Sequence, residues 1–238
     1  LDLDNFDSSL DLYQYFDCPD MILHCAWQNI RDVNSAQHLE DFLPRHKSFL
    51  KNLISNGIHK VIILGTGFEY GNQNGEMVEG VNSVSPNTRY AEAKDSLRMY
   101  VEELNYSFVF QWLRVFYVYE ALGVDGDNIV TLLKKSIDDG DVVFRMSKGD
   151  QLLDYIEVRS LAVIVAKVIL QDKVTGCINC CTGEPITLLN MINKRLKDWG
   201  KSIELDRGFY PYREFESMAI WGSTEKLERA IEYKKFSR

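Results

Sequence analysis

The 238-residue sequence lacks the features that mark membrane, secreted and nucleic-acid-binding proteins. Its longest apolar runs, 108–119 and 161–170, are too short to cross a membrane, and both contain polar residues. Its first residues do not have the composition of a signal peptide. Acidic residues outnumber basic ones by 35 to 27, and the net charge of −8 argues against a nucleic-acid-binding surface. We therefore expect a cytoplasmic protein with neither a membrane nor a nucleic acid as partner.

Cysteine is also scarce, with five residues in no regular spacing. An odd number without a framework pattern indicates a reducing compartment and not a disulfide scaffold. Cys177, Cys180 and Cys181 lie close together, but a zinc site would need a fourth ligand and usually a second paired element. The sequence offers neither, so we predict core or loop thiols and no metal site.

What the sequence does have is an alternation of apolar and amphipathic segments. With 45% apolar residues, the chain suits one large domain or two unequal ones. The short, almost uniformly apolar segment 58–64 is typical of a parallel sheet that is covered on both faces. Within the helical pattern of 35–56, Pro44 should bend or break the helix, and Asn56-Gly57 should end it. The patterns also predict strands at 20–27, which we expect to be buried, and 108–119, and helices at 90–104 and 129–140.

One short motif carries chemistry. If 90–104 is helical, the i, i+4 spacing of Tyr90 and Lys94 puts a phenol and an ammonium on one face. A free tyrosine has a pKa of about 10, and a neighbouring positive charge favours the phenolate and lowers that pKa. The Thr66 hydroxyl, which follows the strand at 58–64, could hold a substrate oxygen at the same point. Together the three residues predict a proton-transfer site for an alcohol or a ketone.

The order of these segments resembles the extended short-chain dehydrogenase/reductases, the NAD-dependent epimerase/dehydratase enzymes that act on nucleotide sugars. The family's catalytic hydroxyl residue stands five positions before the glycine of a Tyr-Gly pair, as Thr66 does before Gly71, and Tyr90 and Lys94 match the other two catalytic positions. Further matches follow in family order at 113–119, 149–158 and 179–185. The resemblance implies an α/β fold: a Rossmann-like doubly wound parallel sheet, its N-terminal part missing, with a smaller C-terminal substrate-binding lobe.

The resemblance also implies which residues form each domain and which ligand each domain binds. Residues 1–119 and 150–176 would form part of a dinucleotide-binding domain, and 120–149 and 177–238 the lobe that binds a nucleotide sugar. An Arg fork can bind phosphate bidentately, which suits the substrate diphosphate. The positions expected to bind the substrate are Gly67, Phe68, Tyr117, Arg145 and Arg213. The positions expected to bind NAD or NADP are Asp2, Leu3, Cys25, Ala26, Trp27, Lys94, Val115 and Phe116.

One hallmark of the family is missing. Its members open with a strand and a Gly-x-x-Gly-x-x-Gly turn that approaches the dinucleotide pyrophosphate, and no such run occurs here. Either the sequence is part of a longer protein, or it is a truncated relative that cannot hold a dinucleotide in the usual way. We favour the first, because the apolar strand at 20–27 would otherwise be exposed. NAD and NADP cannot be told apart, because the deciding residue would follow the missing second strand.

Three functions remain open. The first is a nicotinamide-dependent reductase of a nucleotide-linked 4-keto-6-deoxy sugar, which the stretches 65–71 and 212–221 favour by resemblance. The second is a nucleotide-sugar epimerase with tightly held NAD, which would use the same three catalytic residues. The third is a non-catalytic sugar-nucleotide binder, which the missing glycine-rich turn favours. Dehydration is not expected, because Gly67 and Phe68 stand where the family's 4,6-dehydratases carry Asp-Glu.

The resemblance implies a homodimer as well. In the family, two copies of the Tyr-x-x-x-Lys helix and of the long helix before it pack across a two-fold axis. Here one face of each helix must cover the sheet, and the rest of the apolar surface would meet a second copy. The side chains available for these two tasks are the apolar stripe of 35–56 and Leu97, Tyr100, Val101 and Leu104.

Overall fold

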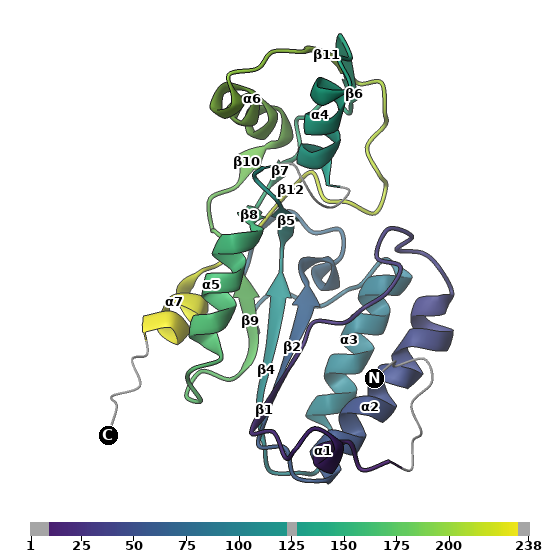
Figure 1. Ribbon diagram of the computed structural model, residues 1–238, viewed down its shortest axis with the longest axis vertical. Coiled ribbons are helices and arrows are strands. Elements are labelled where there is room, and N and C mark those ends of the chain that lie inside the picture. The colour runs from purple at the N-terminus through teal and green to yellow at the C-terminus, as the bar shows by residue number, and fades with distance from the viewer. Residues whose placement is uncertain (1–9, 123–127, 233–238) are drawn as a thin grey trace.

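The fold is built on a parallel sheet with the strand order β1-β2-β4-β9 (Figure 1). The structure is a computed structural model that describes residues 10–122 and 128–232. The four strands are β1 (Met21–His24), β2 (Lys60–Thr66), β4 (Val109–Val115) and β9 (Gly176–Cys180). On one face lie α1 (Leu12–Tyr15), the π-helix η1 (His38–Phe42), α2 (Leu43–Ser55) and α3 (Arg89–Glu102). On the other lie α5 (Val158–Val168) and α7 (Glu225–Glu232).

The central strand β2 explains why the sheet needs helices on both sides. Val61 and Ile63 pack into the cluster under α2 and α3, whereas Ile62 packs into the cluster under α5 and α7. Successive strand residues point to opposite faces, so an uninterrupted apolar strand is stable only when both faces are covered. The expected doubly wound α/β sheet is confirmed for the residues that the structure describes.

The edge strand and the long strand differ from the sequence predictions. The strand predicted at 20–27 is not buried, since β1 pairs with β2 alone and Met21 and Leu23 are 40% and 38% exposed. The strand predicted at 108–119 is two strands, β4 and β5 (Tyr117–Tyr119), which are separated at Phe116. The helix predicted to bend or break near Pro44 does not break: the backbone stays helical from His38 to Ser55, and only its type changes, from the π-helix η1 to α2 at Leu43, with Pro44 in the first turn of α2.

A second, smaller group of elements stands above the carboxyl ends of the main strands (Figure 1). One of its sheets has the order β10-β7-β12-β3, and two strand pairs, β5–β8 and β6–β11, complete it. Its helices α4 and α6 share a core with Phe144 and Met146. The elements are β3 (Gly75–Met77), α4 (Ile129–Asp138), β6 (Val143–Met146), β7 (Leu152–Leu153), β8 (Tyr155–Glu157), β10 (Ile186–Thr187), α6 (Leu188–Trp199), β11 (Glu204–Arg207) and β12 (Ala219–Gly222).

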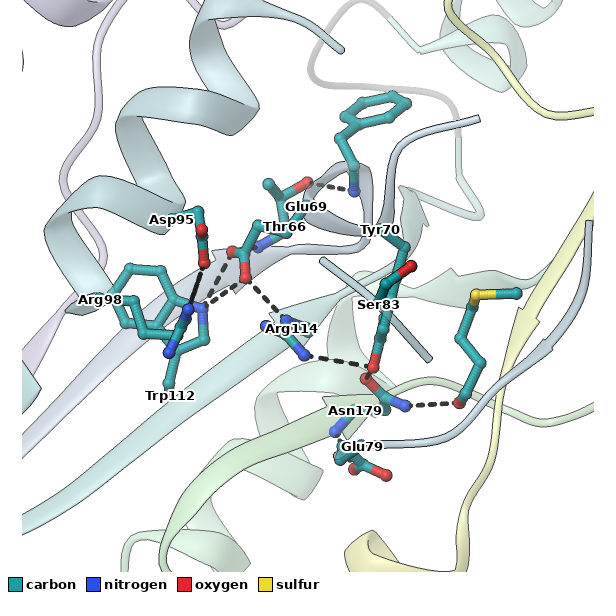
Figure 2. Close-up of polar contacts among 12 residues, drawn as sticks. Thr66, Glu69, Tyr70, Glu79, Ser83, Asp95, Arg98, Trp112, Arg114 and Asn179 are labelled. Atoms are coloured by element: carbon teal, nitrogen blue, oxygen red, sulfur yellow. Dashed lines mark hydrogen bonds and ion pairs between the residues drawn. The ribbon is translucent and has the colours of Figure 1, made fainter. Parts of the chain in front are cut away.

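A buried ion pair joins the central strands to the short 3-10 helix η2 (Gly67–Tyr70) that follows β2. The Glu69 carboxylate has no exposed surface and lies 2.7 Å from Nε of Arg114, whose side chain is 3% exposed (Figure 2). Nε1 of Trp112 donates to both Glu69 oxygens, at 2.9 and 3.0 Å. The backbone N–H of Thr66 donates to Glu69 Oε1 at 2.9 Å, which closes a capping box around η2. Glu69 therefore fixes Thr66 to β4.

The network continues beyond Arg114. Its Nη1 donates to the Tyr70 hydroxyl at 3.3 Å, and that hydroxyl donates to Oδ1 of Asn179 in β9 at 2.9 Å (Figure 2). Burial alone would lower the pKa of Arg114, but the Glu69 charge raises it, so the guanidinium keeps its proton. A glycine is needed beside this network: a Cβ at Gly65 would stand 2.1 Å from Nε1 of Trp112.

This network generates a stability prediction. Glu69→Ala leaves the buried Arg114 charge without its partner, so we expect a loss of about 3–5 kcal/mol in the free energy of unfolding. Urea denaturation measures it, with the exposed Glu92→Ala on α3 as the control, for which we expect a change within about 0.5 kcal/mol. The double variant Glu69→Leu, Arg114→Met removes both charges and should regain most of the loss. An equal loss in Glu69→Ala and Glu92→Ala would contradict this account.

Candidate active site

Thr66, Tyr90 and Lys94 meet at the carboxyl ends of the central strands. Thr66 is the last residue of β2, and Tyr90 and Lys94 lie one turn apart at the start of α3. The helix begins where it does because the Thr88 hydroxyl accepts from the backbone N–H of Ala91 at 3.2 Å. The phenol of Tyr90 shares a hydrogen bond with the Thr66 hydroxyl. The structure thus brings Thr66 and Tyr90 into contact and places Lys94 one turn further along α3, where the Trp27 ring lies close to both Lys94 and Tyr90.

The electrostatics of Tyr90 differ from the sequence expectation. Burial raises the pKa of Tyr90, the Glu69 carboxylate raises it further, and the hydrogen bond with Thr66 opposes the rise only in part. The expected lowering of this pKa by Lys94 is therefore wrong for this arrangement. Tyr90 carries its proton at neutral pH, which makes its phenol a proton donor.

The Lys94 ammonium lies between two indole rings. Its Nζ is 4.6 Å from the ring centroid of Trp27 and 5.4 Å from that of Trp112. The side chain is 3% exposed, and burial lowers the pKa of Lys94 to about 8, although Glu69 and Cys25 raise it. No acceptor among the described residues takes a hydrogen bond from this ammonium. Lys94 therefore offers hydrogen-bond donors that the rest of the described chain does not use.

Trp27 is held by a histidine cluster that the sequence analysis missed. Its ring stacks on His46 with centroids 4.5 Å apart, and its Nε1 donates to Nδ1 of His38 at 3.1 Å. His46 in turn lies 2.9 Å from Nε2 of His24, the last residue of β1, and burial lowers the pKa of His24 to about 3. The rings of Trp27, His24, His38 and His46 thus form one cluster. Trp27 and His38 are the members of this cluster that contact the Tyr90 ring. The only signal for this cluster in the sequence was that three of the chain's four histidines lie within the first 46 residues.

A cavity of about 1410 Å³ lies between the main sheet and the smaller group of elements. Thr66 and Tyr90 stand on its wall, and Val118, Tyr119 and residues of α4, β6 and β8 form much of the rest. Of the residues predicted to bind a cofactor or a substrate, Phe68, Val115, Phe116, Tyr117, Arg145 and Arg213 line it. Gly67 borders a smaller alcove beside it. Cys25 and Ala26 are exposed beyond the end of β1 and line neither space, and Asp2 and Leu3 lie outside the described residues.

The two arginines that line the cavity come from different segments, Arg145 from β6 and Arg213 from the segment between β11 and β12. Arg145 in β6 lies over the Phe209 ring at 4.6 Å and 3.9 Å from Asp206. Arg213 lies 3.4 Å from Glu216 and 5.9 Å from the Phe215 ring centroid. Both side chains are more than half exposed, at 61% and 68%, so their charges are available to a ligand in the cavity.

Residues 10–122 and 128–232 contain no group of three or more His, Cys, Asp or Glu side chains placed to hold a metal ion. Cys180 and Cys181 are buried, and burial raises the pKa of Cys180 to about 12, which fits the expected core thiols. Within the same part of the chain, no helix has the length and apolar character that a membrane span requires.

Comparisons with known proteins agree with this geometry. The dTDP-6-deoxy-L-talose 4-dehydrogenase (NAD(+)) of Aggregatibacter actinomycetemcomitans is 27% identical over 226 residues, which are 91% of this chain and 79% of that protein. A NAD dependent NDP-hexosamine 5,6-dehydratase involved in tunicamycin biosynthesis matches with a TM-score of 0.78 at 16% identity, over 97% of this chain and 76% of its own.

Epimerases match the structure equally well. The UDP-glucuronic acid 4-epimerase of Bacillus cereus, solved with UDP-glucuronic acid and NAD, has a TM-score of 0.77 at 20% identity, over 98% of this chain and 76% of its own. The UDP-glucose 4-epimerase of Thermus thermophilus, solved with NAD, has the same TM-score at 22% identity, over 95% and 76%. The model of the NAD dependent epimerase/dehydratase family matches residues 1–181. The chain, with its doubly wound sheet and its Thr66, Tyr90 and Lys94, belongs to the NAD dependent epimerase/dehydratase family.

Proposed function

We propose that this protein reduces the 4-keto group of a nucleotide-linked 6-deoxy sugar with NADH or NADPH. The observation that carries the proposal is the protonated Tyr90, hydrogen-bonded to Thr66 on the wall of a cavity large enough for a nucleotide sugar. Reduction of a ketone needs a proton donor at the carbonyl oxygen, and a phenol with a raised pKa is in the donor state.

The relatives support the direction of this proposal. The curated relative is a 4-dehydrogenase of a dTDP-6-deoxy sugar, and dehydrogenation at C4 is the reverse of 4-keto reduction. The sequence also lacks a free acid where elimination would need one: Gly67 and Phe68 follow Thr66, and the Glu69 carboxylate is bound to Arg114 and Trp112. Reduction therefore fits the residues of this site better than dehydration does.

The residues present fit the nicotinamide end of a dinucleotide. The carboxyl ends of parallel strands are where doubly wound sheets bind dinucleotides, and Ala26, Thr66 and Val115 stand at the ends of three such strands. Lys94 has donors to spare for the hydroxyls of a ribose. Val115 and Phe116 would form the wall beside the ring. When bound, the nicotinamide supplies the hydride that the carbonyl carbon accepts.

The chain's own residues supply the proton and the orientation. Thr66 hydrogen-bonds the carbonyl oxygen and keeps it within reach of Tyr90. Tyr90 then gives its phenolic proton to that oxygen, so the C=O group becomes CH–OH and a tyrosinate remains until solvent returns the proton. The Lys94 ammonium, one turn along α3, keeps its hydrogen-bond donors for the ribose of the dinucleotide, and its charge is not among the causes that shift the pKa of Tyr90. The smaller group of elements, with Arg145 and Arg213, holds the nucleotide diphosphate.

An epimerase with bound NAD is the second candidate, because the solved 4-epimerases share the fold and the same three residues would serve both reactions. Net consumption of NADPH with a 4-keto sugar nucleotide distinguishes the reductase, since an epimerase turns over without net redox change. A non-catalytic binder would bind the nucleotide sugar and show neither.

The first test is removal of the phenolic proton. In the full-length protein, Tyr90→Phe should lower turnover by about 10² to 10⁴ while dinucleotide binding, measured by calorimetry, stays close to wild type. Tyr100→Phe, on the same helix, is the matched control and should keep full activity. Wild-type turnover in Tyr90→Phe would sink the assignment of Tyr90 as proton donor.

The second test is the pH dependence. Burial lowers the pKa of Lys94 to about 8, so the positively charged fraction of Lys94 falls as the pH rises through 8. The pKa of Tyr90 is raised, so Tyr90 stays protonated over this range. For the wild type we expect kcat/KM to be level below pH 8 and to decline above it. For Lys94→Met we expect a low kcat/KM that does not decline further above pH 8. A wild-type profile that stays level up to pH 10 would show that the Lys94 charge is not used.

The third test concerns the diphosphate. Arg213→Ala should raise the KM for a nucleotide sugar by about 10- to 100-fold, the value of a charged hydrogen bond, and should change kcat much less. Arg207→Ala is the control, because Arg207 binds Asp150 at 3.1 Å and does not line the cavity. An unchanged KM in Arg213→Ala would remove this residue from the substrate site.

The fourth test concerns assembly into the homodimer that we propose. Leu97 and Val101 cover the sheet and have no exposed surface, which leaves Met99, 44% exposed, and the half-buried Tyr100 for a second copy. Light scattering should give a dimeric mass well above micromolar concentration. Met99→Asp should shift that mass toward the monomer, and Met218→Asp, an equally exposed methionine in the smaller group, should not. A monomeric wild-type mass would refute the dimer.

A further inference from the structure

A small alcove opens beside Thr66, apart from the main body of the cavity. Its volume is about 30 Å³, enough for one small group. It shares Thr66, Phe68 and Tyr117 with the large cavity, so a substrate held at Thr66 reaches both spaces. Its position next to the catalytic hydroxyl makes it a site for a substituent close to the reacting carbon.

The lining of the alcove is apolar. Phe68 meets Tyr117 and Phe215 edge to face, with ring centroids 5.7 and 6.3 Å apart. Phe116 and Ile220 belong to a buried apolar cluster and close the far side. Ser217 also borders the alcove, but its hydroxyl donates to the carbonyl oxygen of Gly71 at 3.4 Å and is 2% exposed. Apart from the Thr66 and Tyr117 hydroxyls, a polar group that entered the alcove would meet mainly apolar side chains and would lose most of its contacts with water.

The floor of the alcove depends on a glycine. A Cβ at Gly67 would stand 3.3 Å from Cδ1 of Phe116, a tight contact between two residues that line the alcove. Gly67 has no side chain, so it adds neither bulk nor charge to the alcove. The shape and the apolar character of the alcove therefore come from Gly67 and Phe68 together with Phe116 and Phe215, which pack against them.

We propose that this alcove holds the C6 methyl group of the sugar and selects 6-deoxy sugars over sugars with a hydroxymethyl or a carboxylate at C5. This inference rests on the proposed function in one respect: it takes from it that the C4 oxygen of the sugar lies at the Thr66 hydroxyl. In a hexopyranose, C4 has the neighbours C3 and C5; C3 usually carries a hydroxyl, and in a 6-deoxy sugar C5 carries a methyl. Of these two substituents only the methyl suits an apolar space of this size.

The test uses binding, so it does not require hydride transfer. Calorimetry compares dTDP-6-deoxyglucose with dTDP-glucose, and the same two sugars linked to UDP, so that each pair differs by a single hydroxyl. We expect the 6-deoxy member to bind about 10- to 100-fold more tightly in at least one pair. dTDP-glucuronic acid should bind more weakly than dTDP-glucose, because its carboxylate would be desolvated without a partner.

Variants connect the preference to the alcove. Gly67→Ala should weaken binding of the 6-deoxy member more than binding of the hydroxymethyl member, because the added methyl would press on the Phe116 ring that lines the alcove. Phe215→Ala should open the alcove to water and bring the ratio of the two affinities, 6-deoxy over hydroxymethyl sugar, close to one. Phe16→Ala, an exposed phenylalanine on the far side of the sheet's helices, is the control and should keep the wild-type ratio.

The outcomes separate the two proposals. A wild-type ratio near one, or a ratio that Gly67→Ala and Phe215→Ala both leave unchanged in folded protein, overturns the methyl site even if the protein reduces 4-keto sugars. A preference that these variants abolish supports the methyl site even if no hydride transfer is found, in which case the reductase proposal alone fails.

Discussion

The buried pair of Glu69 and Arg114 is the interaction on which the geometry of this site depends. A carboxylate without exposed surface is tolerated because a guanidinium, an indole N–H and a backbone N–H all donate to it. These donors come from the end of β2 and from β4, so the pair fixes the place where the two strands end. Thr66 is bound to Glu69 through its backbone, which sets its hydroxyl toward Tyr90. The same carboxylate then acts through space on the proton equilibria of Tyr90 and Lys94.

Tyr90 and Lys94, the two titratable groups of the site, have different surroundings, and these set their protonation states. Tyr90 is buried and lies near the negative charge of Glu69, and both raise its pKa and favour the neutral phenol, although the hydrogen bond with Thr66 opposes this in part. Lys94 is one turn away but faces aromatic rings, which stabilise a cation without accepting its protons. A phenol that holds its proton and an ammonium that keeps its donors free are the two states that a ketone reduction needs at its start.

The sequence was sufficient for the order of elements, because that order follows from local patterns such as the apolar run in β2 and the helix period in α3. The spacings around Thr66 and within α3 also predicted Thr66, Tyr90 and Lys94 as the candidate residues, whose catalytic role stays a prediction. The sequence was insufficient where long-range contacts decide. The role of Glu69 depends on Trp112 and Arg114, more than forty positions away, and a single glutamate in a loop carries no local signal for burial. The exposure of β1 was mispredicted for the same reason, since an apolar segment does not reveal whether a neighbouring strand covers it. Likewise, the direction of the Tyr90 pKa shift depends on the burial of Tyr90 and on the Glu69 carboxylate, which the i, i+4 spacing of Tyr90 and Lys94 could not reveal.

The two indole rings around Lys94 have an optical consequence. Trp27 and Trp112 are two of the chain's four tryptophans, and both lie within 5.4 Å of the Lys94 ammonium, measured from ring centroid to Nζ. The emission of an indole responds to a charge held close to its ring. Trp199 in α6 and Trp221 in β12 belong to the smaller group of elements, so their replacement would leave the pair at the site as the emitters. The intrinsic fluorescence of the protein then becomes a label-free record of the charge on Lys94 and of any ligand that draws this ammonium away from its rings.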